Sequence, residues 1–305
     1  MPATPETPDL PSRRWRILLQ LLARLPQGGL SRAFGRVADL PIPERIRPAV
    51  LSSFARAVGV DLSEVEQPLE HYATLNEFFV RRLRPGARSW PTERGVLASP
   101  VDGATGQVGR ITSGRILQAK GRWYSAAELI GDPAEAERFE GGSFLTLYLS
   151  PRDYHRIHVP CDGDIPFARH IPGALLPVNT AAVTHVPDLF PRNERLLCAI
   201  DGPLGRVLVV AVGAYNVGRI SAAFDPEWHA DAGERQWVTN RPDGEASRHD
   251  YVPPISVRQG EELMAFHLGS TVVLLLEPGA CELDAGLAPE RTVRLGMALG
   301  RGNRS

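Results

Sequence analysis

Three short clusters of this 305-residue chain contain residue types that can do acid–base and nucleophilic chemistry. The first cluster contains Asp102, the second contains His155 and His158, and the third contains Ser270. An acid, two imidazoles and a hydroxyl are the groups of an activated-serine site, in which histidine takes the serine proton and a carboxylate stabilises the resulting cation. Taken singly, each cluster is weak evidence for a catalytic site, because Asp-Gly pairs and Gly-Ser-Thr runs usually form turns.

The setting of Ser270 narrows the kind of nucleophile. It stands in Leu-Gly-Ser-Thr at the start of an apolar run, whereas α/β-hydrolases carry their serine in Gly-x-Ser-x-Gly at a strand-to-helix elbow. This context fits a serine that attacks its own chain better than one presented to an outside substrate. Two alternatives stay open. A conventional serine hydrolase would keep an intact chain, and a non-catalytic membrane-binding protein would be indifferent to Ser270→Ala.

The histidines and the single lysine limit the choice of cofactor. A His-x-x-His pair can be a metal half-site, but His155 and His158 lack a carboxylate or cysteine partner at ligand spacing, so we predict no metal. Pyridoxal phosphate needs a lysine, and Lys120 is the only one, so we predict that this cofactor is not used. We interpret His267, three residues before Ser270, as a packed or solvated strand residue.

Charge and cysteine content indicate where the protein acts. The formal net charge is −1, so bulk charge favours neither nucleic acid nor an acidic partner. Residues 11–48, however, hold eight arginines against Asp39 and Glu44, and for this basic end lipid headgroups are as plausible a target as RNA. We predict an anionic membrane surface as partner and no nucleic acid. Three cysteines without a CxxC pair argue against a disulfide framework and a zinc knuckle. No apolar run approaches the length of a transmembrane helix.

Helical patterns are confined to the N-terminal part. Residues 12–25 place Trp15 and several leucines on one face with arginines beside them, which predicts either a helix lying in a membrane surface or one docked on the protein's own core. A second helix is predicted over Glu44–Val58. A third is predicted over Thr74–Leu83, where Thr74 and Glu77 form a capping box.

From about residue 97 the pattern changes to short apolar runs between turns, which predicts strands at Phe144–Leu149, Arg206–Val212 and Thr271–Leu276. We therefore predict an α+β protein with an N-terminal helical, membrane-associating segment (1–90) and a mainly antiparallel β-rich catalytic body (91–305). The charged stretch Pro226–Pro254 is interpreted as a long surface excursion.

The three clusters, in this order and spacing, resemble the phosphatidylserine decarboxylase family, in its bacterial, pyruvoyl-dependent form. The resemblance runs from about residue 74 to 280, and one departure is Pro191, where a small residue is expected. Five further motifs share it: Leu75–Arg81, Leu117–Gly121, Pro177–Asn179, Leu189–Arg195 and Val212–Gly218.

The resemblance implies roles for the clustered residues. Asp102, His158 and Ser270 would form a charge relay in which His158 takes the Ser270 proton and Ser270 attacks the carbonyl of Gly269. Elimination would then leave a covalent pyruvoyl group in place of Ser270, with a β chain of residues 1–269 and an α chain of residues 270–305. His155 would support decarboxylation and reprotonation.

The resemblance also implies the reaction and its setting. The pyruvoyl group would form an imine with phosphatidylserine, release carbon dioxide and give phosphatidylethanolamine, as a step of phospholipid biosynthesis. We expect a homodimer that lies peripherally on the cytoplasmic side of the inner membrane, bound to anionic lipid. Arg152 and Arg156 are candidates for holding the glycerophosphate.

Overall fold

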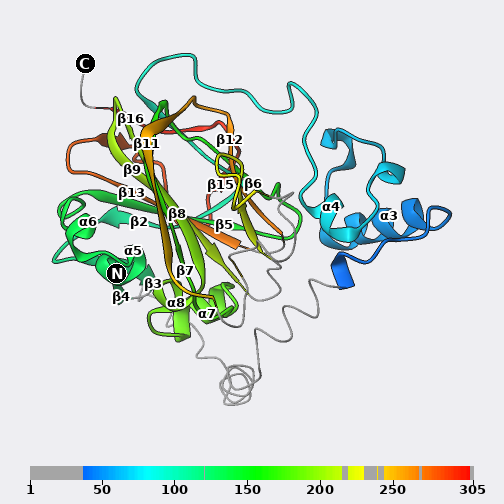
Figure 1. Cartoon of the computed structure of the whole chain (residues 1–305), viewed down its shortest axis with the longest axis horizontal. Coiled ribbons are helices and arrows are strands. Elements are labelled where there is room, and N and C mark those ends of the chain that lie inside the picture. The colour runs from blue at the N-terminus through cyan, green and yellow to red at the C-terminus, as the bar shows by residue number, and fades with distance from the viewer. Residues whose placement is uncertain are drawn as a thin grey trace, which may run out of the picture.

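The computed structural model describes residues 37–119, 121–214, 219–229, 239, 244–267 and 270–302, with the backbone alone described at residue 270. In these ranges a helical unit precedes a body of antiparallel sheets (Figure 1). The predicted α+β class is confirmed. The helix predicted over residues 12–25 lies outside the described residues.

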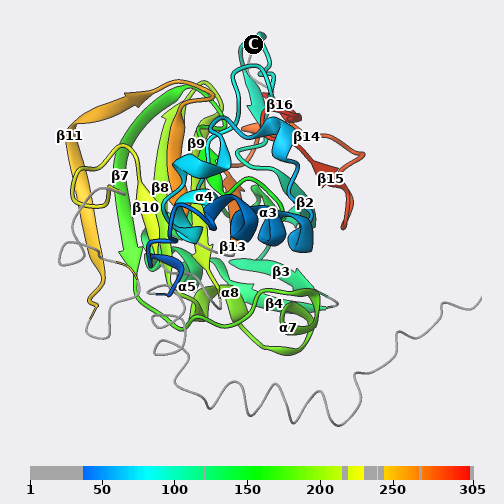
Figure 2. The same cartoon turned by 90° about the vertical axis from the view of Figure 1, so that its right-hand side faces the viewer.

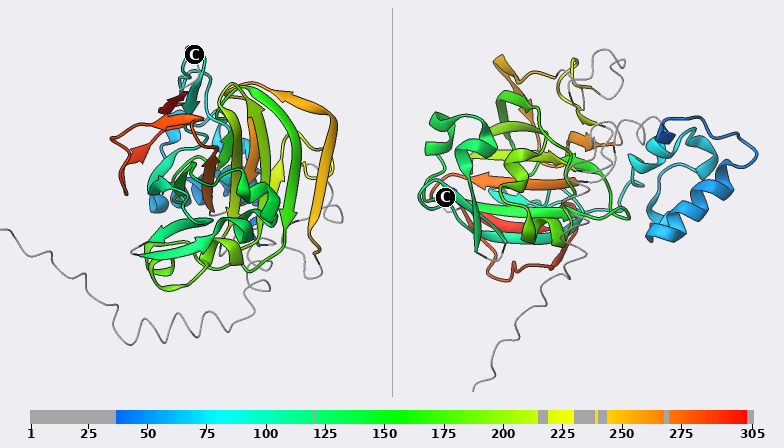
Figure 3. Two further views of the ribbon diagram at one scale, coloured as in Figure 1. Left: turned by 90° about the vertical axis from the view of Figure 1, so that its left-hand side faces the viewer. Right: turned by 90° about the horizontal axis from the view of Figure 1, so that it is seen from below.

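The helical unit has a small core of its own. Its elements are α3 (Arg47–Val58), η1 (Leu62–Glu64), η2 (Leu69–His71) and α4 (Leu75–Phe79). The α3 helix confirms the predicted second helix, with proline in its first turn and Gly59 as a left-handed C-cap at φ 84°. Leu51 and Ala55, one turn apart on α3, pack with Phe78 of α4 in this core. Figure 3 shows the unit standing beside the β-rich body.

The capping box of α4 is confirmed. The Thr74 hydroxyl accepts a hydrogen bond from the Glu77 amide at 3.0 Å, and the Glu77 carboxylate accepts one from the Ala73 amide at 2.6 Å. The predicted extension to Leu83 is wrong, because α4 ends at Phe79. Residues 82–84 instead exchange backbone hydrogen bonds with residues 64–66, and a helix cannot form that ladder.

The body is built on one eight-stranded antiparallel sheet in the order β11-β7-β8-β9-β13-β5-β2-β15. Its members are β2 (Gly103–Arg110), β5 (Ser143–Leu149), β7 (Gly163–Ile171), β8 (Arg195–Gly202), β9 (Gly205–Gly213), β11 (Ser247–Val257), β13 (Ser270–Leu276) and β15 (Thr292–Val293). The three predicted strands are confirmed as β5, β9 and β13. Residues 271–276 of β13 are all buried, so this strand reads as a continuous run rather than as an alternating one.

Three smaller sheets and four short helices complete the described body. The sheets consist of β1 (Val96–Ala98) with β16 (Ala298–Gly302) and β14 (Cys281–Leu283); of β10 (Ile220–Ala222) with β12 (Glu262–Phe266) and β6 (Arg156–His158); and of β3 (Arg115–Ala119) with β4 (Arg122–Ser125). The helices are α5 (Ala126–Ile130), α6 (Pro133–Glu137), α7 (Thr180–His185) and α8 (Leu189–Arg192). Figure 2 shows α3 and α4 in front of the body.

The predicted excursion over Pro226–Pro254 is wrong at its C-terminal end. Residues from Ser247 onward form β11, which pairs with β7 at the edge of the large sheet. An edge strand tolerates prolines and exposed side chains, and these features hid it in the sequence. At the other end Trp228 is buried, so the stretch is anchored there too.

Hydrophobic contacts form a large cluster within the body and a separate one within the helical unit. A division of the chain at residue 90 stays a prediction. The described ranges contain no helix with the length and apolar character that a bilayer crossing requires.

Candidate active site

The three clusters meet at one end of the large sheet. Asp102 directly precedes β2, Leu149 ends β5 and Ser270 begins β13, and these strands are neighbours in the order β13-β5-β2. Because neighbours are antiparallel, the starts of β2 and β13 lie beside the end of β5. The chain leaving β5 then makes a turn and reaches His155 and, at the end of β6, His158. The Ser270 side chain and Gly269 lie outside the described structure.

Backbone contacts join the first two clusters. The His158 amide donates to the Pro100 carbonyl at 2.8 Å, so the segment before β2 lies against β6. Gly103 makes a close approach possible, since a Cβ at this position would collide with the carbonyl oxygen of Tyr148 on β5. The Asp-Gly pair therefore serves the contact between β2 and β5.

The His158 ring is held in one tautomer. Its Nδ1 lies 2.8 Å from the Gly260 carbonyl oxygen, which can only accept, so Nδ1 carries the proton. Its Nε2 lies 3.1 Å from the hydroxyl of Tyr154, whose pKa is raised by burial, so the phenol donates. Burial lowers the pKa of His158. The result is a neutral imidazole with a basic Nε2.

The Asp102 carboxylate bonds to groups other than His158. Its carboxylate accepts two hydrogen bonds from Arg88 and one from the Leu295 amide at 2.8 Å. Although burial acts to lower it, hydrogen bonds to Asp102 and Glu64 raise the pKa of Arg88 above its ordinary value. In the described structure no hydrogen bond joins Asp102 to His158, so a direct relay between them stays a prediction.

His155 is buried between the turn and α4. Its Nδ1 donates to the Asp153 carbonyl at 2.8 Å, and its ring lies 4.0 Å, centroid to centroid, from that of Phe79. Burial lowers the pKa of His155 to about 3. Nε2 is buried and has no hydrogen-bond partner among the described residues, which leaves a lone pair available in a nonpolar setting.

A cavity of about 660 Å³ lies between the helical unit and the β10-β12-β6 sheet. Its lining includes Arg81, Arg82, Arg156, Arg219 and His267. Basic groups thus gather next to the segment that leads to Ser270. Of the two arginines named as phosphate candidates from sequence, Arg156 lines the cavity, while Arg152 has a side chain that is 63% exposed and does not line it.

His267 is packed, as interpreted from the sequence, and it also lines the cavity. It follows β12, it is buried, and its Nε2 lies 3.0 Å from the Ser221 hydroxyl while its Nδ1 lies 3.3 Å from the Asn76 side-chain oxygen. Burial lowers its pKa well below the ordinary value. The only available signal was its position three residues before Ser270, because Asn76 is 191 positions away.

Cys161, Cys198 and Cys281 are buried free thiols. In the part of the chain that the structure describes, no three histidine, cysteine, aspartate or glutamate side chains are grouped as a metal site would require.

Comparison with known proteins identifies close relatives. The family model for phosphatidylserine decarboxylase matches residues 75–301. A phosphatidylserine decarboxylase proenzyme of Anaeromyxobacter sp. (strain K) is 48% identical over 285 residues, covering 93% of this chain and 98% of the relative. The protein of the same name from Myxococcus xanthus (strain DK1622) is 43% identical over 282 residues, covering 92% and 97%.

Proposed function

The chain belongs to the phosphatidylserine decarboxylase family, and we propose that it cuts itself between Gly269 and Ser270 and then decarboxylates the serine headgroup of phosphatidylserine to give phosphatidylethanolamine. The name proenzyme, which its relatives carry, fits a chain that matures by cleavage. The observation that carries the proposal is the meeting of the starts of β2 and β13 with the end of β5, beside a neutral His158.

We propose the following cleavage step. The Tyr154 hydroxyl first releases Nε2 of His158, which then takes the proton of the Ser270 hydroxyl, and the oxygen attacks the carbonyl carbon of Gly269. The peptide C–N bond is exchanged for an ester, and the freed amine of residue 270 takes up the proton. Loss of the α-proton then breaks the ester C–O bond, so Gly269 leaves as a carboxylate. Water converts the resulting dehydroalanine into the pyruvoyl group and releases ammonia.

The surroundings fit a covalent carbonyl group at residue 270. Strand pairing with Leu149 and Gly213 fixes the backbone there from both sides, and the cavity lined by His267 offers room for a headgroup. The pyruvoyl carbonyl supplies an electrophile for the substrate's amine and a sink for the electrons released with carbon dioxide. His155 carries its own proton on Nδ1, so Nε2 is the atom that exchanges a proton with the substrate.

Asp102 supports this chemistry from a distance. Its contacts with Arg88 and the Leu295 amide fix the segment whose Pro100 carbonyl accepts from the His158 amide. We therefore propose that Asp102 holds β6, and with it His158, in place before the chain is cut. Its negative charge also favours the imidazolium that forms when His158 takes a proton.

Ser270→Ala tests the proposed function directly. The purified wild-type protein should yield two masses, for residues 1–269 and for a fragment starting at a pyruvoyl group in position 270, and should be inhibited by hydroxylamine. Ser270→Ala should yield the full-length mass alone and no decarboxylation. Intact-protein mass spectrometry decides: a wild-type enzyme that decarboxylates phosphatidylserine with residues 269 and 270 still joined would refute the proposal.

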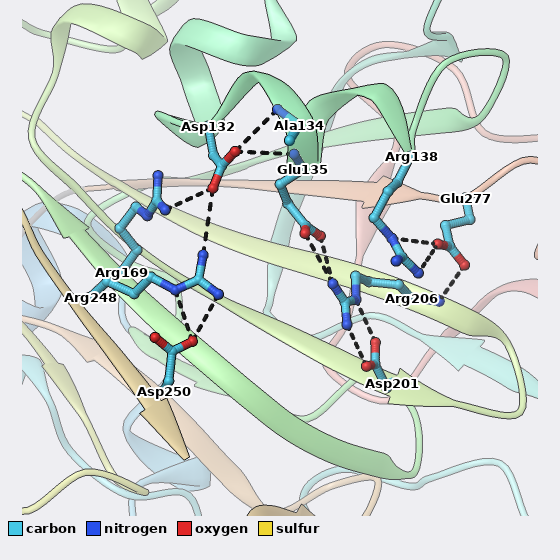
Figure 4. Close-up of polar contacts among 10 residues, drawn as sticks. All are labelled: Asp132, Ala134, Glu135, Arg138, Arg169, Asp201, Arg206, Arg248, Asp250 and Glu277. Carbon is cyan, nitrogen blue, oxygen red and sulfur yellow. Dashed lines mark hydrogen bonds and ion pairs between the residues drawn. The ribbon is translucent and has the colours of Figure 1, made fainter. Parts of the chain in front are cut away.

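The two fragments are expected to stay together after cleavage. In β13 the small fragment supplies the strand between β5 and β9, and both of these belong to the large fragment. Just beyond β13, Glu277 accepts hydrogen bonds from Arg138 at 2.7 and 3.0 Å and from the Arg206 amide at 2.9 Å (Figure 4). Both arginines belong to the large fragment, so cleavage leaves these contacts available.

We further propose that the helical unit attaches the enzyme peripherally to the cytoplasmic side of the inner membrane. Four large apolar side chains in residues 37–50 are exposed: Val37, Leu40, Ile46 and Val50, at 63%, 60%, 51% and 41%. Exposed arginines at 45 and 56 lie in the same unit. Apolar insertion combined with basic charge is the pattern of interfacial binding.

Vesicle co-sedimentation tests the attachment. The protein should bind vesicles with anionic lipid more tightly than neutral ones, and binding should weaken as salt rises. Ile46→Ser with Val50→Ser should weaken binding, whereas Val252→Ser, at a position that is 94% exposed on β11, serves as the matched control. Equal binding by both variants would contradict the proposal. A homodimer is likewise proposed, and light scattering of the detergent-free protein would test it.

A further inference from the structure

Arg81 is a buried cation without a carboxylate partner in the described structure. It lies two residues beyond the end of α4, and it is 4% exposed. Its Nη2 donates to two backbone carbonyls, those of Arg152 at 3.0 Å and Asp153 at 3.3 Å, and its guanidinium lies 5.5 Å from the Phe78 ring centroid. Its Nε is buried and makes no hydrogen bond to any described residue. A buried charge of this kind is costly unless an anion compensates it.

The cavity lining holds four arginines and three carboxylates, those of Asp39, Glu66 and Glu77. Arg82 and Arg156 both pair with a further carboxylate, that of Glu262. Glu77 lines the cavity too, but its carboxylate caps the α4 helix through the Ala73 amide. The Asp39 carboxylate accepts a hydrogen bond from the side-chain amide of Asn76. None of the described carboxylates forms an ion pair with Arg81.

We propose that this cavity binds the phosphodiester of the substrate headgroup, with Arg81 as the buried anion-binding residue and Arg82 at its solvent-facing side. The assignment rests on the proposed function for the identity of the substrate. Arginine's planar fork matches phosphate oxygens, and a desolvated guanidinium interacts with them more strongly than an exposed one does. Arg156 lines the cavity and directly follows His155 in the chain. The cavity therefore lies next to the segment that carries both site histidines.

Arg81 ends the motif Leu75–Arg81, but the motif does not assign it a role. Its burial and its missing partner are visible only once α4 is placed against the 152–154 turn. The exposed Arg152, by contrast, makes a contact of 3.8 Å with Asp153, and nothing directs it toward the cavity.

A titration of the uncut protein tests the inference without using the pyruvoyl group. Ser270→Ala protein would be titrated with sn-glycerol 3-phosphate by isothermal calorimetry, and with acetate as the carboxylate probe. Arg81→Gln in this background should weaken glycerol phosphate binding by about ten-fold or more, as expected for a charge-assisted hydrogen bond. Arg110→Gln is the matched control, because Arg110 is exposed and donates to the Gly141 carbonyl away from the cavity.

A second variant separates binding from folding, because Arg81 also holds two backbone carbonyls. The Arg82 side chain is 64% exposed, so Arg82→Gln should fold normally and weaken glycerol phosphate binding by about two- to five-fold. In the mature enzyme it should raise KM for phosphatidylserine and leave kcat nearly unchanged. Thermal unfolding midpoints should match for Arg82→Gln and Arg110→Gln.

Three results would overturn the inference. The first is a parent that does not bind glycerol phosphate, and the second is equally tight binding of it by the parent, Arg81→Gln and Arg82→Gln. The third result is an Arg81→Gln variant that loses acetate binding and retains glycerol phosphate binding. Failure of the proposed function has a different signature, namely a wild-type chain that is never cut. The titration remains informative in that case because it uses the uncut protein.

Discussion

The two ends of β13 differ in how their polar groups are satisfied. At the Leu276 end the charged side chains are paired: Arg206 binds Glu135 and Asp201, and Arg138 binds Glu277 (Figure 4). Farther along the sheet, Asp132 caps α6 and also pairs with two arginines of the sheet (Figure 4). At the Ser270 end, the buried Nε2 of His155 and Nε of Arg81 have no described partner.

The contrast separates stability from chemistry along one strand. Backbone pairing is continuous from residue 270 to 276 on both sides, so the hydrogen-bond ladder does not distinguish the two ends of β13. The side chains at the two ends do differ. Buried polar groups are nearly always satisfied, and those that are not tend to mark functional sites, where a ligand or reacting group completes them. The paired end therefore holds the fragments together, and the incomplete end is where we place catalysis.

The largest expected effect comes from His158→Ala. Removing the general base should slow self-cleavage by a factor of about 10² to 10⁴, followed as the appearance of the 270–305 fragment on a denaturing gel. Because burial lowers the pKa of His158, its base form persists on lowering the pH to 6.5. The wild-type cleavage rate should therefore fall to half of its plateau value below pH 6.5, the ordinary histidine pKa, as Nε2 becomes protonated.

His155→Ala provides the comparison. It should still cut itself and yet decarboxylate poorly, because its Nε2 is assigned to the substrate's proton rather than to that of Ser270. Rapid maturation of His158→Ala would remove His158 from the base role, and near-normal turnover by His155→Ala would return that residue to a structural one.

A smaller effect is expected from the pair that supports His158. If Asp102 acts by fixing the segment before β2, then Asp102→Asn and Arg88→Gln should both slow cleavage, each by about ten-fold, since either change breaks the same contact and costs about 1.4 kcal/mol. If Asp102 acts as a direct partner of the imidazole, Asp102→Asn alone should slow cleavage strongly. Fragment appearance measured for both variants under one condition decides between the two.

The parts of the fold that were predictable are those whose signal is local. Strand β13 is buried on both faces, so its apolar run was readable, and the Thr74–Glu77 cap involves residues three apart. Strand β11 was missed because it is an exposed edge strand containing prolines. Helix α4 was overextended because its end depends on pairing with residues 64–66.

The site divides in the same way. Asp102, His155, His158 and Ser270 were named from motifs, and their types alone suggested the chemistry. The partners that set their state could not be read, because Gly260, which fixes the His158 tautomer, is 102 positions away in the chain. The contact between Asn76 and His267 spans an even longer separation. Spacing in sequence carries no information about such pairs.

The smallest expected effect lies at the satisfied end of β13. Glu277→Gln removes the charge that binds Arg138, whose side chain is 47% exposed, so the loss of unfolding free energy should be about 1 kcal/mol, and less at high salt. Chemical denaturation measures it, with Glu282→Gln as the control, since Glu282 is exposed on β14 within the same fragment. Cleavage and decarboxylation should be unchanged, because no reacting group lies at this end. If Glu277→Gln slowed maturation as much as His158→Ala does, the two ends of β13 would not be functionally separate, and the placement of catalysis at the Ser270 end would lose its basis.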